Sequence, residues 1–292
     1  MLVEVLDGIG GCLIYIENEE YSEDNSVIAA LLANEHKIYR ESAYTIIRTQ
    51  NIFSTPEITS LEMKINSELE DRMKSVLKKI ACLCGCTEQE SKTVLRLPAE
   101  GWEELVDMWS CHNREFGHLV EQEMNPKKDG VLYSTLHLIM EAERAPKCLI
   151  ARNNCDSLES APKTLKIFYN EIKMCLSDEY LLFHYLYDLF QIRQEIEIAA
   201  EKMYTIRLLD ITYTYHGKIA HSPPLDLSLK IAYTSRPIGT ENAENPSKPK
   251  EESKCNINAY YTDKLIEVLL KNSIGIEMGG RSVSFIRKVR TE

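Results

Sequence analysis

The chain has 292 residues, and its 34 lysine and arginine residues stand against 45 aspartate and glutamate residues, which gives a formal net charge of −11. This length corresponds to one large domain or two ordinary ones, and 44% hydrophobic residues are enough to build a core. The negative charge argues against direct binding to nucleic acid or to an anionic membrane. A protein partner or a small ligand is the better expectation.

Strands are expected in the first part of the chain. The segments 3–6, 12–16 and 42–49 are short runs of apolar, β-branched or aromatic residues, as strands usually are. The apolar positions of 56–80 fit no single period, so this stretch is interpreted as a strand followed by a helix, or as two strands. A further strand is predicted at 94–97, directly before a proline.

The segment 101–112 is predicted to form a helix. Its apolar residues recur at helical spacing and share one face, which contains Trp102, Leu105, Val106 and Trp109. Acidic residues at its start interact favourably with the positive end of the helix dipole. We expect the two tryptophans to pack in the core rather than to bind a ligand.

The second half continues with mixed elements. Residues 131–140 are expected to form a buried strand or a short helix, and 165–169 a strand. The longest helix is predicted over 178–203, where apolar residues line one face. Two strands should follow at 206–213 and 227–233, on either side of a loop that contains glycine and proline.

The end of the chain completes an α+β fold of mainly antiparallel sheets with inserted helices. A final helix is expected at 263–271 and a last strand at 283–289. Two domains are predicted: a strand-rich domain over 1–160 and an α+β domain over 161–292. The second contains a flexible insert at 236–256, which has almost no apolar residues.

The cysteines indicate a metal site. Nine cysteines, unevenly spaced, do not resemble a disulfide framework, so we expect an intracellular protein. Cys82, Cys84 and Cys86 are followed later by Cys111 and His112, and four such ligands arranged as a tetrahedron bind zinc. The spacing leaves open which cysteines take part, and buried cysteines without metal are the alternative. We predict a closed, structural Zn²⁺ that staples the centre of the fold.

No catalytic residue is predicted. The sequence lacks the glycine-rich nucleotide loops, the serine elbow and the zinc-protease motif. Cys148 and Cys155 form at most a weak second pair, and unligated thiols are the preferred interpretation. Cys255 lies beside the flexible insert, but no histidine or acidic residue is identifiable as its activator. Neither a secretory signal nor a membrane span is expected.

The run RLPAEGWEELVDMWSCHN at 96–113 resembles the signature of the HECT-like E2-binding family, with a Leu-Pro pair, two tryptophans and a Cys-His pair in register. Looser likeness continues at 165–172, 206–214, 229–233 and 260–289. The family includes a HECT-like E3-class ubiquitin-protein ligase of animals and a yeast protein important for cleavage and polyadenylation. This chain departs from its usual C-x-x-C pairs.

The resemblance implies two kinds of partner. Family members bind ubiquitin-conjugating enzymes (E2) or act as ubiquitin ligases, and they also bind the metallo-β-lactamase-type endonuclease of the mRNA 3′-end cleavage and polyadenylation factor. We expect an interaction protein that binds and stabilises or assembles this endonuclease, with an E3-type ligase or E2-binding protein as the alternative. Whether it is an enzyme stays open. The resemblance places it in nucleus and cytoplasm.

Overall fold

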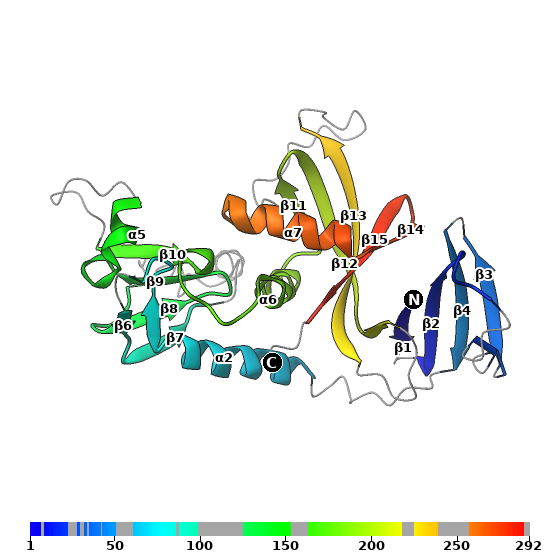
Figure 1. The fold of residues 1–292 in the computed structure, drawn as a ribbon, viewed down its shortest axis with the longest axis horizontal. Helices are drawn as coiled ribbons and strands as arrows, with labels where there is room; N and C mark the ends of the chain where they lie inside the picture. Colours follow the sequence, from blue (N-terminus) through cyan, green and yellow to red (C-terminus); the bar gives the residue numbers. More distant parts are fainter. Residues whose placement is uncertain are drawn as a thin grey trace, which may run out of the picture. The chain divides into compact units, whose positions relative to one another are not determined.

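The fold is seen in a computed structural model of the chain (Figure 1). The structure describes residues 1–6, 9–22, 28–29, 32–33, 35–41, 43–50, 61–85, 88–98, 125–152, 163–217, 225–238 and 257–288.

The chain forms two compact units, each described by itself. Unit 1 consists of Met1–Glu57 and Arg193–Glu292, and unit 2 of Ile58–Ile192. The units are not consecutive halves of the chain, because strands from both ends of the chain share one sheet in unit 1. They therefore differ from the division into 1–160 and 161–292 that the sequence led us to expect.

Unit 1 is built around one antiparallel sheet (Figure 1). Its described strands lie in the order β14-β15-β13-β12-β1-β2-β4-β3, and β11 pairs with the first half of β12. The strands are β1 (Leu2–Leu6), β2 (Gly11–Glu17), β3 (His36–Arg40), β4 (Tyr44–Gln50), β11 (Glu195–Ala199), β12 (Lys202–His216), β13 (Asp226–Pro237), β14 (Ser273–Met278) and β15 (Arg281–Arg287). The two longest strands, β12 and β13, pair along most of their length and form the middle of the sheet.

Both faces of this sheet bury apolar side chains. Since neighbouring residues of a strand point to opposite faces, Val3 and Ile14 join one buried cluster, whereas Leu2 and Tyr15 join a second cluster with Phe285. The first strand of the chain is thus part of the core of unit 1.

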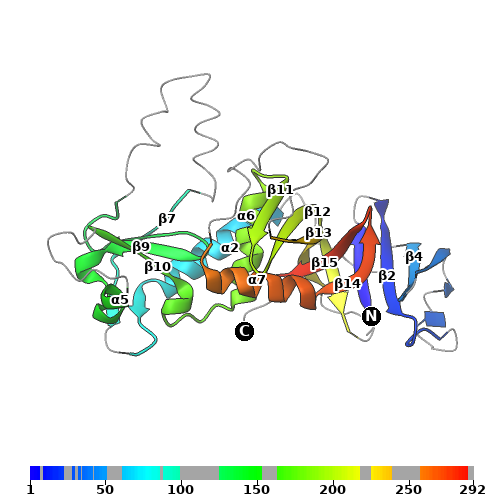
Figure 2. The same ribbon diagram turned by 90° about the horizontal axis from the view of Figure 1, so that it is seen from above.

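Helix α7 (Ala259–Lys271) covers this sheet beside β15, as two views show (Figures 1 and 2). Its start is capped by Asn258, whose side chain accepts a hydrogen bond of 3.0 Å from the backbone N–H of Tyr261. Tyr261 and Leu265 are buried on the face toward the sheet. The helix predicted at 263–271 therefore begins one turn earlier.

Unit 2 contains a four-stranded sheet in the order β10-β9-β8-β7, where β7 and β8 run parallel and the other pairs antiparallel. A separate two-stranded ladder joins β5 to β6. The strands are β5 (Lys79–Ala81), β6 (Glu88–Glu90), β7 (Thr93–Arg96), β8 (Gly130–Tyr133), β9 (His137–Glu141) and β10 (Thr164–Phe168). The helices described are α2 (Leu61–Val76), α5 (Lys147–Arg152) and α6 (Asp178–Phe190), with short 3₁₀ turns at Ala142–Arg144 and Tyr169–Glu171.

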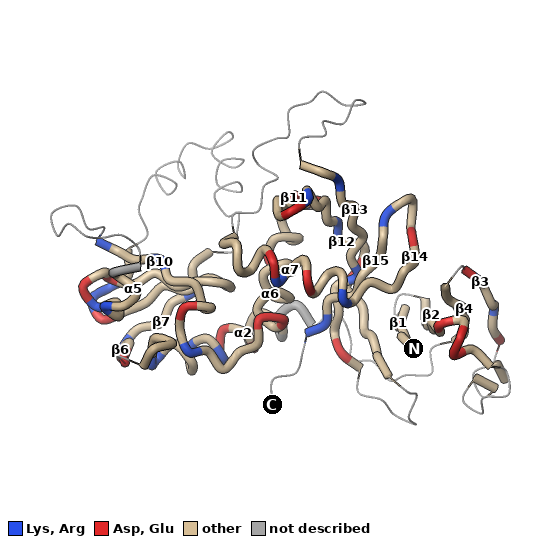
Figure 3. The backbone as a smooth tube through the Cα atoms, turned by 45° about the horizontal axis from the view of Figure 1, so that its top comes forward, with Lys and Arg blue, Asp and Glu red and all other residues tan. Residues whose placement is uncertain are grey.

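Helices α2 and α6 differ in their surroundings. Every residue from Tyr180 to Leu189 of α6 is buried, as in a helix that is covered on all sides. The α2 residue Arg72 places its guanidinium 5.4 Å from the centre of the Tyr180 ring. Charged residues of both signs lie along α2 (Figure 3), where Glu70 pairs with Lys74 one turn later.

The predicted fold class is confirmed, because the described elements are mainly antiparallel strands with inserted helices. The helix predicted over 178–203 is wrong beyond Phe190, where the chain turns and enters β11. In β11 the buried residues Ile196 and Ile198 alternate with more exposed neighbours. This period of two is typical of a strand and overrides the helical spacing of the wider window.

Two shorter segments also need correction. In the described part of 56–80, residues 61–80, a helix precedes a strand, whereas we expected a strand before a helix or two strands. Ile65, Leu69 and Met73 are buried at a spacing of four residues, which is typical of a helix. Residues 131–140 lie in two antiparallel strands, β8 and β9, rather than in one element.

Some predictions lie outside the described residues. These are the helix at 101–112 and most of the insert at 236–256. Of that insert the structure describes 236–238, where 236 and 237 are the last residues of β13 and 238 lies in a turn. Among the described residues, none of the helices has the length and apolar character that a membrane crossing requires.

Candidate metal centre

A tight turn after β5, at residues 82–85, carries two of the predicted ligands. We call it the cysteine turn. The backbone N–H of Gly85 donates a hydrogen bond of 3.0 Å to the carbonyl of Cys82, which closes the turn. Gly85 has φ +71°, a left-handed conformation that glycine adopts without strain. The turn brings the Sγ atoms of Cys82 and Cys84 to 3.1 Å from each other.

The base of the cysteine turn is held by the segment that follows β10. Cys82 forms a backbone bridge with Ile172, and the N–H of Lys173 donates a hydrogen bond of 2.8 Å to the carbonyl of Ala81. Cys82 and Ile172 are both buried. The turn therefore rises from an anchored base that unit 2 itself provides.

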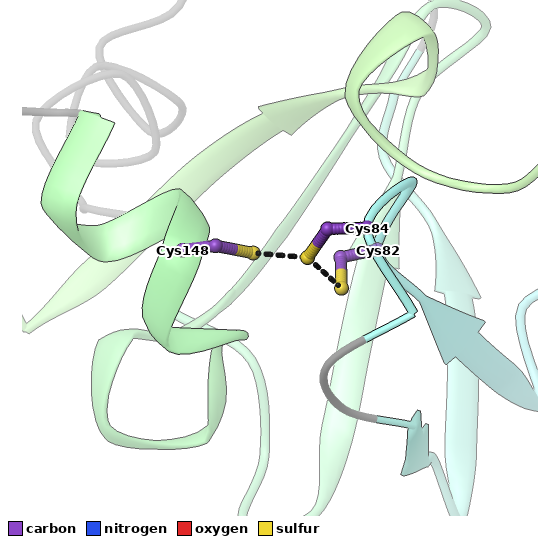
Figure 4. A group of neighbouring side chains, drawn as sticks. All are labelled: Cys82, Cys84 and Cys148. Atoms are coloured by element: carbon purple, nitrogen blue, oxygen red, sulfur yellow. Dashed lines mark hydrogen bonds between the residues drawn. The ribbon is translucent and has the colours of Figure 1, made fainter.

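A third cysteine comes from α5. Pro146 precedes this helix, a position where its missing N–H costs no hydrogen bond, and its carbonyl accepts a bond of 2.8 Å from Leu149 N–H. The side chain of Leu149 is buried and packs α5 against the rest of unit 2. Cys148, next to it, points toward the cysteine turn (Figure 4), and its Sγ lies 3.4 Å from that of Cys84.

Cys82, Cys84 and Cys148, which we call the cysteine group, could hold a metal ion, since their Sγ atoms all lie within 4.8 Å of one another (Figure 4). Zinc–sulfur bonds of ~2.3 Å in a tetrahedron place sulfur atoms ~3.8 Å apart. The observed 3.1 Å and 3.4 Å are slightly shorter, so small side-chain rotations would open the site to that spacing. Three thiolates make a soft ligand set of the kind that zinc prefers. The residues present therefore fit a bound zinc ion.

Burial changes across the group. Cys82 is buried, Cys148 is half-buried and Cys84 is exposed. A metal ion at this position would be anchored on the protein side by Cys82 and would lie close to the surface at Cys84.

The predicted ligands meet this geometry in part. Cys82 and Cys84 lie together, whereas Cys86, Cys111 and His112 lie outside the described residues. The group includes Cys148, which the sequence suggested only as part of a weak pair with Cys155. Its distance from the cysteine turn along the chain hides the relationship, because no short motif joins the two segments.

A partly buried ion pair connects other elements of unit 2. Arg96, at the end of β7, donates through Nη2 to Oδ2 of Asp188 at 2.8 Å and through Nη1 to Oδ1 of Asn66 at 3.3 Å. Thr135 donates to the same Asp188 oxygen at 3.0 Å. Burial raises the pKa of Asp188, and the Arg96 guanidinium and the Thr135 hydrogen bond oppose that rise.

These contacts join α2, β7 and α6 through polar groups that are buried or partly buried. Arg96 is also the first residue of the run 96–113 that carries the family signature. The side chain at the start of the signature is therefore tied into the core of unit 2.

Comparison with known proteins finds a family that part of the chain is similar to. Residues 55–179 match the model of the family described as HECT-like Ubiquitin-conjugating enzyme (E2)-binding. The match contains the three cysteines and every strand of the four-stranded sheet, and it confirms the resemblance found in the sequence. No curated protein and no solved structure matches the chain.

Proposed function

We propose that this protein, whose residues 55–179 match the HECT-like E2-binding family, binds a ubiquitin-conjugating enzyme through unit 2. The observation that carries the proposal is the overlap between the family match and the folded body of unit 2, from α2 to the start of α6. The cysteine group and the signature residue Arg96 both lie within it.

We further infer that Cys82, Cys84 and Cys148 hold a zinc ion. Cys86, Cys111 and His112 stay candidates for the fourth ligand. The ion would join the cysteine turn to α5, since its ligands come from both, and a site closed by four protein ligands supplies structural stability rather than chemistry. Its contribution would be to keep one face of unit 2 in a single conformation for a partner.

This function needs no thioester on the chain itself. A bound E2 already carries activated ubiquitin, and a protein that holds the E2 contributes position. Ligase activity is therefore a separate question, and the only cysteine near the C-terminus, Cys255, lies outside the described residues.

The endonuclease partner predicted from the resemblance is a second hypothesis. It is supported by the signature at 96–113 and by the net charge of −11, which favours a basic protein surface as partner. A pull-down from nuclear and cytoplasmic extracts, analysed by mass spectrometry, tests the partner and both compartments. Absence of the endonuclease and its associated factors would refute the hypothesis.

The first test of E2 binding uses the purified chain with its metal content determined on the same sample. Binding to a fixed panel of purified E2 enzymes is measured by biolayer interferometry, before and after removal of metal with a chelator. We expect at least one E2 to bind the zinc-loaded protein and to bind the stripped protein more weakly. Zinc-loaded protein that binds no E2 in the panel would overturn the proposal.

A further inference from the structure

One large apolar side chain stands at the tip of the cysteine turn. Leu83 is 55% exposed, although both of its neighbours are cysteines of the candidate metal centre. Within the described part of the family-matched segment, Leu95 is the other large apolar side chain that is exposed, at 43%. A single exposed leucine is ordinary on a protein surface, so its position has to carry the argument.

The residues on both sides of Leu83 are held in place. Cys82 on one side is buried and bridged to Ile172, and Cys84 on the other side turns its sulfur toward Cys148. The Gly85 hydrogen bond closes the loop behind it. Because the backbone on both sides is held, a partner that covers Leu83 pays little conformational entropy.

A positive charge lies at the cysteine turn, next to Gly85. The Nζ atom of Lys173 is 3.5 Å from the position that a Cβ atom on Gly85 would occupy, so the ammonium group reaches the side of the turn. Lys173 is itself exposed. The cysteine turn therefore carries both an exposed apolar side chain, Leu83, and a cation at Gly85, and such a surface fits an apolar pocket edged by acidic groups.

Leu95 is exposed as well, but it does not lie between metal-binding cysteines. It lies on β7, an edge strand of the four-stranded sheet, and both its strand neighbours are half-buried. No metal-binding residue flanks it. Leu95 therefore serves as a matched control, a leucine of similar exposure in the same family-matched segment.

We propose that Leu83 is the central contact through which the cysteine turn binds the E2, with Lys173 guiding the approach of an acidic edge on the partner. This inference rests on the proposed function, since the family match supplies the identity of the partner. It also gives the metal a specific role, which is to present Leu83 at a fixed position.

The experiment compares Leu83→Ser, Leu83→Met and Leu95→Ser with the unaltered chain, all loaded with zinc. Binding is measured to the E2 from the panel that binds the unaltered protein most tightly. We expect Leu83→Ser to weaken binding about tenfold or more, as for a hot-spot residue, and Leu83→Met and Leu95→Ser to stay within about threefold of the unaltered chain. Lys173→Glu should slow association, with an effect that shrinks at high salt.

The outcomes separate the two proposals. If no E2 binds the unaltered chain, the proposed function fails. If an E2 binds and Leu83→Ser binds equally well, the role of Leu83 is wrong while E2 binding stands. If Leu83→Ser loses its zinc, its binding result cannot be used, and hydrogen exchange of the unaltered protein with and without the E2 is measured instead. Residues 82–85 should then exchange more slowly in the complex, and an unchanged rate would overturn the inference.

Discussion

Cys84 and Cys148 bring their sulfur atoms to 3.4 Å from each other, although 64 residues separate them in the chain. One lies on a turn after β5 and the other on α5, beyond the sheet formed by β7, β8 and β9. The contact is therefore a product of the complete fold of unit 2. A metal ion bound here would hold the cysteine turn and α5 together.

Replacing Cys148 tests the ligand set directly. Mutating a residue that only hydrogen-bonds to a metal ligand typically lowers metal affinity about 10–100-fold. Because Cys148 would be a ligand itself, we expect Cys148→Ser to lower zinc affinity at least as much. Zinc content by mass spectrometry and competition with a chelating dye measure this. The control is Cys175→Ser, an exposed cysteine outside the group. Equal zinc affinity in the two variants would contradict the assignment.

Removing the metal should loosen unit 2 locally. After treatment with a chelator, the backbone of residues 82–85 and of α5 should exchange hydrogen faster, because the ion no longer joins them. The amides of β12 and β13 in unit 1 provide an internal reference and should be unchanged. A uniform response of both units, or none, would argue against a local staple.

A buried ion pair in unit 1 makes a prediction about stability. Lys230 Nζ lies 2.8 Å from Oε1 and 2.9 Å from Oε2 of Glu4, and Tyr15 donates to the same carboxylate at 2.6 Å. Lys230→Met should cost about 3–5 kcal/mol of unfolding free energy, because it leaves a buried carboxylate without its cation. Urea denaturation measures this.

The matched control for that variant is Lys264→Met, which breaks an exposed pair with Glu267 on α7 and should change stability little. The double variant Glu4→Gln with Lys230→Met should recover part of the loss, since both charges are then absent. A loss as large in the double variant as in Lys230→Met would show that the ion pair is not its cause.

The stability of unit 2 should depend on pH through His137. Burial, together with the nearby Lys166 ammonium, lowers the pKa of His137 to about 3 from its ordinary 6.5. Below about pH 6.5 His137 is protonated in the unfolded chain but stays neutral in the folded chain. The free energy of unfolding therefore decreases as the pH is lowered from about 6.5 to about 3. From pH 7 to pH 5 the loss is about 2 kcal/mol.

His137→Phe removes this titration and keeps an aromatic ring beside Phe168. The difference in unfolding free energy between pH 7 and pH 5 should therefore shrink by about 2 kcal/mol in the variant. His36→Gln, on the exposed edge strand β3, is the control and should keep the full difference. An unchanged pH dependence in His137→Phe would assign the effect to other groups.

Particular elements show where sequence patterns were sufficient. The runs at 3–6 and 12–16 form strands as predicted, because their apolar and β-branched residues favour the strand conformation locally. The spacing of Ile65, Leu69 and Met73 contained the helical signal for α2, but polar neighbours obscured it. The alternation in β11 was hidden for the opposite reason, since apolar residues on both sides extended the helical pattern of α6 too far.

The sequence by itself determined the α+β class, the candidate ligands Cys82 and Cys84 and the resemblance to an E2-binding family, because each of these depends on residues that are close in the chain. Only the tertiary structure decided that the first strand pairs with β12 and that Cys148 lies beside Cys84. Such long-range contacts follow from how strands pair and how helices pack across the whole unit. No local pattern records that arrangement.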